Sequence, residues 1–153
     1  MSRMFDKCVK LKSANLFDNT YQVTNMSYLF NECEKLKYVN VSNWNTSKVT
    51  TMRSMFSHCY EILVSLDVSR WDTSQVTDMA EMFMSCRWDN SKDSYHYLDV
   101  KGFVTSKVTD MSYMFYDAQI EADCSGWDVS RVSYYRNFRN SSTVTPPSAW
   151  PDA

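Results

Sequence analysis

The sequence predicts an α/β repeat fold: a right-handed solenoid of about 25 residues per coil, with short parallel strands on one face and short helices on the other. Three observations support this prediction. One stretch of residues recurs along the chain, a second pattern with the alternation of a strand precedes each copy, and the intervals between copies have the length of a solenoid repeat.

The recurring stretch has the spacing of a short amphipathic helix. Its copies occupy residues 23–30, 49–56, 76–83 and 108–115, and a degraded fifth copy begins at Val132. Counted from the first Val, apolar residues stand at offsets 0, 3, 6 and 7, which share one face of a helix. The Thr that follows each of these four valines suits a helix N-cap. Each copy therefore predicts a turn or two of helix.

The segment before each copy has the pattern of a short strand. Leu36, Val39, Val41 and Trp44 fit the leucine-rich-repeat frame L-x-x-L-x-L-x-x-N, with Trp in place of Asn, and the next repeat ends in the same way at Trp71. Phe103 and Trp127 occupy the Trp position in the third and fourth copies. A strand and a short helix cannot bury their apolar faces alone, so neighbouring units must stack.

We expect the solenoid to span residues 1–139, with a partial first repeat and a degenerate last repeat, followed by a C-terminal tail at 140–153. The first eight residues align with Met26 to Cys33, so the chain begins in the middle of a repeat. An open solenoid end exposes core, and the prediction is that another chain contacts Met1, Met4 and Phe5. The degraded copy at the other end is typical of a capping repeat.

Residues 66–79, continuing through Phe83 to Cys86, resemble the BspA-like surface-protein repeat, a leucine-rich-repeat variant also known as the bacterial lipoprotein surface repeat. The resemblance covers Met1 to about Arg139. It implies a leucine-rich-repeat solenoid in a cell-surface or secreted protein, with a role in adhesion and protein binding and with no catalytic residues. The chain departs from that family's pattern in lacking an export signal or lipobox cysteine, and in its strand regions at 11–17 and 122–124.

Composition narrows the class of partner. Lys plus Arg number 16 and Asp plus Glu 18, so a formal charge of -2 favours neither nucleic acid nor an anionic membrane. No apolar run approaches the roughly 20 residues that cross a bilayer. We therefore expect a protein partner of unknown identity, no nucleic acid and no membrane insertion.

No constellation of residues predicts an enzyme, a cofactor or a metal site. The two histidines, His58 and His96, lie in different parts of the repeat, and no phosphate-binding or nucleophile-elbow motif is present. Four of the five cysteines stand three residues after the motif Phe, which favours small buried core positions over zinc ligands. Stacking could bring two of these thiols close, but a disulfide demands more than closeness.

The outward strand positions are the candidate binding residues. Stacking lines up Asn40, Asp67, Asp99 and Asp123 as a polar column. The column could hold a cation or a basic partner, although local bonds from each residue to the backbone or to the Ser two positions on are the favoured interpretation. Outward aromatic residues either form a protein-binding surface or fill a half-buried strand face. The predicted binding residues are Tyr38, Asp67, Trp88, His96, Tyr97, Asp99 and Asp123.

The function that these observations favour is a protein–protein interaction or adhesion module presenting a leucine-rich-repeat surface. The alternative is a non-catalytic structural subunit docked by its open N-terminal end in a larger assembly. The insertion at residues 87–94, which contains Trp88, is either a loop pinned by one aromatic residue or a contact site.

Overall fold

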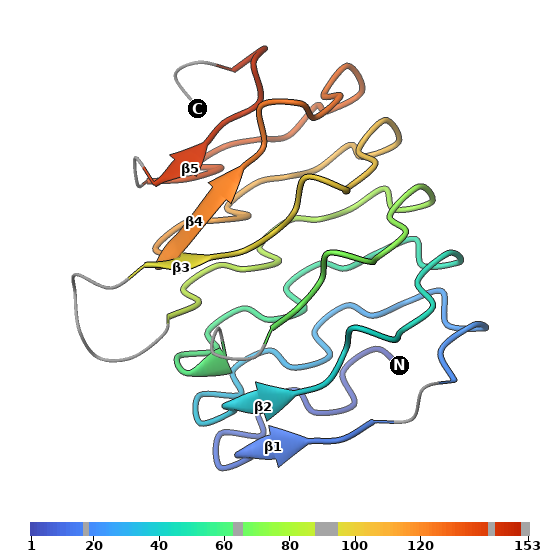
Figure 1. The fold of residues 1–153 in the computed structure, drawn as a ribbon, viewed down its shortest axis with the longest axis vertical. Helices are drawn as coiled ribbons and strands as arrows, with labels where there is room; N and C mark the ends of the chain where they lie inside the picture. Colours follow the sequence, from blue (N-terminus) through green and yellow to red (C-terminus); the bar gives the residue numbers. More distant parts are fainter. Residues whose placement is uncertain (17–18, 63–65, 88–94, 141–142, 151–153) are drawn as a thin grey trace.

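Successive repeats lie one above another from the N-terminal to the C-terminal end of the protein (Figure 1). The computed structural model describes residues 1–16, 19–62, 66–87, 95–140 and 143–150. The strands of these described residues lie on one side of this stack (Figure 1). They are β1 (Ser13–Ala14), β2 (Tyr38–Val39), β3 (His96–Tyr97), β4 (Ile120–Asp123) and β5 (Val144–Thr145).

The strands form two small parallel sheets, in the orders β1-β2 and β3-β4-β5. Ser13 pairs with Tyr38 in the first sheet, and His96 pairs with Ile120 in the second. Side chains alternate between the interior and solvent, as the pleat of a strand requires. In β2 the side chain of Tyr38 is exposed and that of Val39 is buried.

No helix is present among the described residues, so the predicted α/β leucine-rich-repeat solenoid, with helices on one face, is wrong. Each copy of the recurring stretch is a run of turns. In the copy at residues 23–30, the N–H of Leu29 donates to the carbonyl of Met26 (3.3 Å), which closes one turn. The N–H of Tyr28 instead donates to the carbonyl of Arg53 in the next repeat (2.9 Å). Along the run, backbone N–H groups that donate within the repeat alternate with N–H groups that donate to the neighbouring repeat.

Left-handed backbone conformations at two positions of each run exclude a helix. Tyr28 has φ 57° and Glu32 has φ 56°, whereas a right-handed helix needs φ near −60°. The same two positions are left-handed in the other copies, at Ser54 and His58, at Glu81 and Ser85, and at Tyr113 and Asp117. An L-residue pays a steric cost in this region, and the bonds to the neighbouring repeat hold it there.

Short polar side chains also compete with helix formation in these runs. The carboxylate of Asp110 accepts the N–H of Ser112 two residues on (2.9 Å), and Asp78 accepts the N–H of Ala80 in the same way (3.0 Å). The Thr predicted as a helix N-cap has another role. The Thr50 hydroxyl donates to the carbonyl of Thr24 in the preceding repeat (3.1 Å), so these threonines join repeats.

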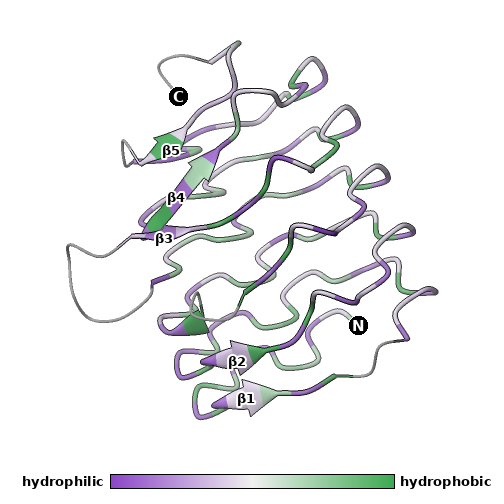
Figure 2. Ribbon diagram, viewed as in Figure 1, coloured by the Kyte–Doolittle hydropathy of each residue, from purple (hydrophilic) through white to green (hydrophobic). Residues whose placement is uncertain are grey.

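The core consists of columns of identical residues, as predicted for the Met, Phe and Trp positions. The Met and Phe side chains of the four recurring stretches are fully buried. From Phe5 to Phe115 each Phe ring stacks on the Phe of the next repeat, with centroids 5.4 Å apart for Phe5 and Phe30 and 6.0 Å apart for Phe56 and Phe83, whereas Phe138 meets Phe115 edge-on. Apolar and polar residues alternate in short stretches along every repeat (Figure 2). Each repeat therefore contributes one layer to a continuous core.

The cysteines occupy small core positions in register. The Cys59 thiol donates to the carbonyl of Phe30 in the preceding repeat (3.1 Å), and the Cys86 thiol donates to that of Phe56 (2.8 Å). All five cysteines have free thiols, four of them buried. Burial raises the pKa of the Cys33 thiol to about 12. Burial raises the pKa of Cys59, Cys86 and Cys124 in the same way, so the four buried thiols remain protonated at neutral pH.

The two ends of the stack differ in how their last layer is covered. Residues 143–150 fold over the last repeat, where the Trp150 ring stacks on Tyr135 (4.5 Å) and meets Phe138 edge-on (5.7 Å). In the first repeat, Phe5 is half-buried against Phe30, and the side chain of Met4 is 53% exposed.

We predict that Trp71→Ala lowers the free energy of unfolding by about 3–5 kcal/mol. The Trp71 ring is buried between Trp44 (6.2 Å) and Phe56 (6.3 Å), and its Nε1–H donates to the carbonyl of Val41 (2.9 Å). Denaturant unfolding of the two proteins measures the difference.

The matched control for this prediction is Trp71→Phe, which keeps a stacked ring and removes the hydrogen bond to Val41. It should cost less than the alanine variant, with about 1 kcal/mol coming from the hydrogen bond. A loss below about 1 kcal/mol for Trp71→Ala would contradict the assignment of this column to the core.

A second prediction tests the left-handed positions. Tyr113 has φ 58°, and its ring meets Tyr116 edge-on. Tyr113→Val and Tyr113→Asn both remove that ring contact, but Asn tolerates the left-handed region and a β-branched residue does not. Thermal unfolding should show the Val variant less stable than the Asn variant by about 1–2 kcal/mol. Equal stabilities would mean that the turn relaxes into another conformation.

Candidate functional site

Three of the predicted binding residues lie in the sheet β3-β4-β5. Tyr97 is exposed and pairs in register with Glu121 of β4. His96 is partly buried, and this burial lowers the pKa of its imidazole. Asp123, in β4, forms an ion pair with Lys101 (3.3 Å). The structure places these three residues on one sheet, apart from Tyr38 in the sheet β1-β2.

The polar column is held by local bonds, which was the favoured interpretation. Asp67 accepts both the N–H (3.1 Å) and the hydroxyl (2.7 Å) of Ser69, and Asp123 accepts the same two groups of Ser125. Asp99 accepts the N–H of Lys101 (3.2 Å). Within the described parts of the chain, no group of three or more Asp, Glu, His or Cys is arranged to hold a metal ion. The column thus fixes the corners of the repeats.

The prediction for Trp88 falls outside the residues that the structure describes. The same is true of most of the insertion at 87–94. Arg87, just before it, donates to the carboxylate of Asp117 (2.7 Å), which also accepts the hydroxyl of Ser85 (3.1 Å). The start of the insertion is therefore anchored to the next repeat.

Two hollows of the strand side lie along β1 and β2. One hollow of about 390 Å³ is lined by Ser13, Ala14, Asn15, Tyr38, Val39 and Asn40. A second hollow of about 470 Å³ adjoins it and is lined by Lys12, Ser13, Lys35, Lys37, Tyr38 and Glu61. Both are open and shallow. Because Ser13 and Tyr38 line both hollows, they form one continuous strip, which we call the β1–β2 groove.

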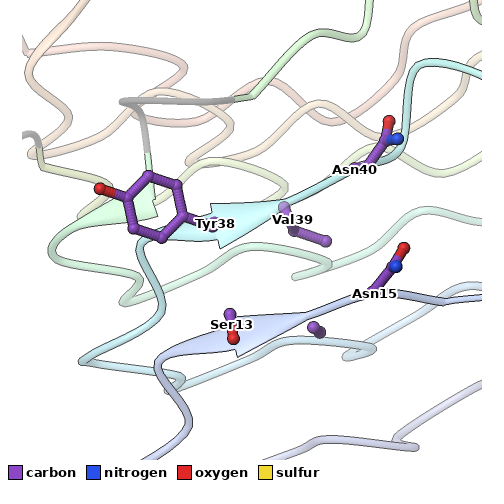
Figure 3. A pocket seen from close by; sticks show the side chains of 6 residues that line it. Ser13, Asn15, Tyr38, Val39 and Asn40 are labelled. Atoms are coloured by element: carbon purple, nitrogen blue, oxygen red, sulfur yellow. The ribbon is translucent and has the colours of Figure 1, made fainter.

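One end of the β1–β2 groove carries two amide side chains. Asn15 and Asn40 follow β1 and β2 directly and occupy equivalent places in successive repeats, as the pairing of Ala14 with Val39 shows. Figure 3 shows their amide groups pointing the same way, with the ring of Tyr38 at the other end of the hollow. The Oδ1 of Asn40 accepts the Ser42 hydroxyl (3.0 Å), which orients the amide.

The opposite end of the groove is basic. Lys35 and Lys37 both form ion pairs with Glu61, at 3.2 and 3.0 Å, and Lys12 lines the same hollow. The hydrogen bond to Lys37 lowers the pKa of the Glu61 carboxyl, and the same bond raises the pKa of Lys37. One carboxylate therefore pairs with two ammonium groups, and a third lysine lines the same hollow.

Of the residues that line the groove, the predicted binding residues include Tyr38, and the predicted polar column includes Asn40. The strand region at residues 11–17 fits the leucine-rich-repeat frame poorly, so its register could not be assigned from that pattern. The spacing of the lysines could have indicated the basic end of the groove. Lys12 and Lys37 directly precede the paired residues Ser13 and Tyr38, so they stand at equivalent places in stacked repeats.

Comparison with known proteins corrects the resemblance to the BspA-like leucine-rich-repeat family. The family model that matches is described as "Mycoplasma protein of unknown function, DUF285", and it matches residues 1–98 and 91–150. The leucine-rich-repeat and solenoid descriptions are accordingly wrong for this chain. No curated protein and no solved structure matches it. Among the described residues, no helix is long and apolar enough to cross a membrane.

We predict that Ser69→Ala raises the pKa of Asp67. The side-chain and backbone hydrogen bonds of Ser69 hold that pKa below its ordinary value, and the variant removes the hydroxyl. A carboxyl group whose pKa is lower in the folded state than in the unfolded state stabilises the fold at pH values above its unfolded-state pKa. That contribution is lost as the pH falls through the folded-state pKa. The variant should therefore be less stable at neutral pH, and the difference should shrink in acid.

The measurements for this prediction are an NMR titration of the Asp67 carboxyl and urea unfolding over an acid-to-neutral pH series. Ser74→Ala is the matched variant at the next corner, where Ser74 lowers the pKa of Asp72 in the same way. An unchanged Asp67 pKa would contradict the assignment of the local bond as its cause.

Proposed function

We propose that this chain, which belongs to the family described as Mycoplasma proteins of unknown function, DUF285, is a non-catalytic protein-binding module that uses the strand side of its repeat stack. The observation that carries the proposal is the exposure of Tyr38, 59%, on the wall of the β1–β2 groove. An exposed aromatic ring beside hydrogen-bonding groups and charges is the composition of a protein-binding surface.

Tyr97 supports the same proposal from the second sheet. Tyr97 is 49% exposed and belongs to β3, which lies on the same side of the stack as β2 with Tyr38 (Figure 1). The two rings thus offer separate anchors on one side of the molecule. Tyr and Trp supply large contact areas at low cost in side-chain entropy, which is why they dominate binding energy at interfaces.

The non-catalytic part of the proposal rests on the state of the reactive side chains. Cys59 and Cys86 are fully buried, and burial holds the pKa of each thiol above its ordinary value, so neither supplies a thiolate nucleophile. His58 bonds to the neighbouring Ser57 (2.8 Å) in a run of turns, whereas His96 lies in β3. These placements favour a scaffold over a reaction centre.

The test is selection from a random peptide display library on the intact protein. We expect enriched peptides that lose most of their affinity for Tyr38→Ala, because truncating an anchoring aromatic residue removes about 2 kcal/mol or more of binding energy. Isothermal titration calorimetry with each enriched peptide measures the loss. Tyr134→Ala is the matched control, since Tyr134 is 66% exposed and lies outside the five strands, at an isolated bridge to Asp110.

Enriched peptides that bind all three proteins equally would contradict the proposal, as would a library from which nothing is enriched. A second candidate function, a structural subunit docked through its first repeat, is favoured by the 53% exposure of Met4 beside the half-buried Phe5. Light scattering separates the two: association that rises with concentration and is abolished by Met4→Glu would favour the subunit.

A further inference from the structure

We propose that the β1–β2 groove binds an extended acidic peptide segment, with carboxylates over the lysines at one end and peptide backbone against Asn15 and Asn40 at the other. This inference rests on the proposed function and adds the chemistry of the partner. Of the residues that line this groove, the outward columns of the sequence included Tyr38 and Asn40.

The basic end of the groove differs in charge from the chain as a whole. The whole chain has a formal charge of -2, yet the basic end of the groove sets Lys12, Lys35 and Lys37 against the single carboxylate of Glu61. The side chains of Lys35 and Lys37 are 58% and 52% exposed even while they pair with Glu61. Ammonium groups that share one counter-ion attract further carboxylates, and the attraction weakens with salt.

The shape of the groove selects a single extended segment. The two hollows adjoin along the strand direction and share only Ser13 and Tyr38, so the strip is long and narrow. Apart from Glu61, which belongs to the third repeat, its lining residues come from two neighbouring repeats, which is too little surface for a folded domain to bury there. In an extended chain, successive side chains point to opposite sides, so every second side chain of a bound peptide faces the lysines.

Amide side chains complete the site. Asn carries both a hydrogen-bond acceptor and donors, and therefore pairs with the N–H and C=O groups of a peptide backbone whatever its sequence. Asn15 and Asn40 stand in register, with their amides pointing the same way (Figure 3). The bond from Ser42 to the Oδ1 of Asn40 leaves the NH₂ group of that amide as the part offered to a ligand. The ring of Tyr38 lies between the amides and the lysines.

The experiment uses fluorescence anisotropy with the intact protein and a labelled short peptide of alternating glutamate and serine. The reference probe is the same peptide with glutamine in place of glutamate. We expect the glutamate peptide to bind more tightly and to lose affinity as salt rises. Lys35→Gln and Lys37→Gln should each weaken binding about twofold to fivefold, the range of one exposed charge pair.

Two further variants make the result specific to the groove. Lys101→Gln removes the same charge from the strand side but outside the groove, where Lys101 pairs with Asp123, and it should leave the affinity unchanged. Glu61→Gln removes the carboxylate that competes with the ligand and should strengthen binding. Circular dichroism of every variant checks that the fold is retained.

Equal affinity for the two peptides, or equal losses from Lys35→Gln and Lys101→Gln, would overturn the inference. The inference would also be overturned if a labelled oligonucleotide displaced the peptide and bound more tightly than the peptide, because the groove would then bind polyanions in general. Failure of the inference is distinct from failure of the proposed function: library peptides that need Tyr38 but carry no acidic residues would refute the acidic ligand and keep the protein-binding module.

Discussion

Backbone hydrogen bonds between successive repeats are the interaction on which the rest of the structure depends. In each run of turns, every second N–H donates to the next repeat, to the carbonyl of the residue just before the equivalent position, as Tyr28 does to Arg53 and Ser54 does to Ala80 (2.9 Å each). These bonds hold equivalent side chains in register, so identical residues meet: Phe30 stacks on Phe56 with centroids 5.7 Å apart. A repeat then makes most of its contacts with its two neighbours.

The same constraint explains the polar residues that the repeats share. A chain that turns sharply several times per repeat leaves N–H groups at its corners, and Asp, Asn, Ser and Thr side chains bond to them. Asp72 accepts the N–H of Ser74 (2.9 Å) at one corner, while the buried Thr73 hydroxyl donates to the carbonyl of Val104 in the next repeat (3.0 Å). Residues with these duties stabilise the fold, which leaves recognition to positions where the repeats differ.

Sequence patterns predicted which residues are buried far better than they predicted the backbone that buries them. Offsets of 0, 3, 6 and 7 from Val23 put Met26 and Phe30 inside, and both are fully buried. A short helix and a run of turns bury the same residues, so periodicity alone cannot separate them. Whether the chain forms a helix or a run of turns depends on hydrogen bonds to a neighbouring repeat, which are non-local. It also depends on left-handed positions such as Glu32, which the sequence does not mark because they are not glycines.

The site was harder to predict than the core for a related reason. Stacking brings Lys35 and Lys37 to Glu61 and places Lys12 beside them, but these residues come from three different repeats, and their columns are not repeated elsewhere. A consensus sequence of the repeats does not retain residues that occur in one repeat only. Tyr38 stood out because its aromatic ring faces outward from a strand. The signal for the rest lies in the differences between repeats, read only after the register is known.

The two sheets therefore differ in charge although they share one backbone plan. In the β1-β2 sheet, three lysines share the carboxylate of Glu61, whereas in the β3-β4-β5 sheet Lys101 is matched by Asp123 and stands among further acidic side chains at Asp99 and Glu121. The strand side is thus positive toward the N-terminal end of the stack and negative toward the other. A partner guided by electrostatic attraction arrives in one orientation along the stack, because reversing it would set like charges against each other.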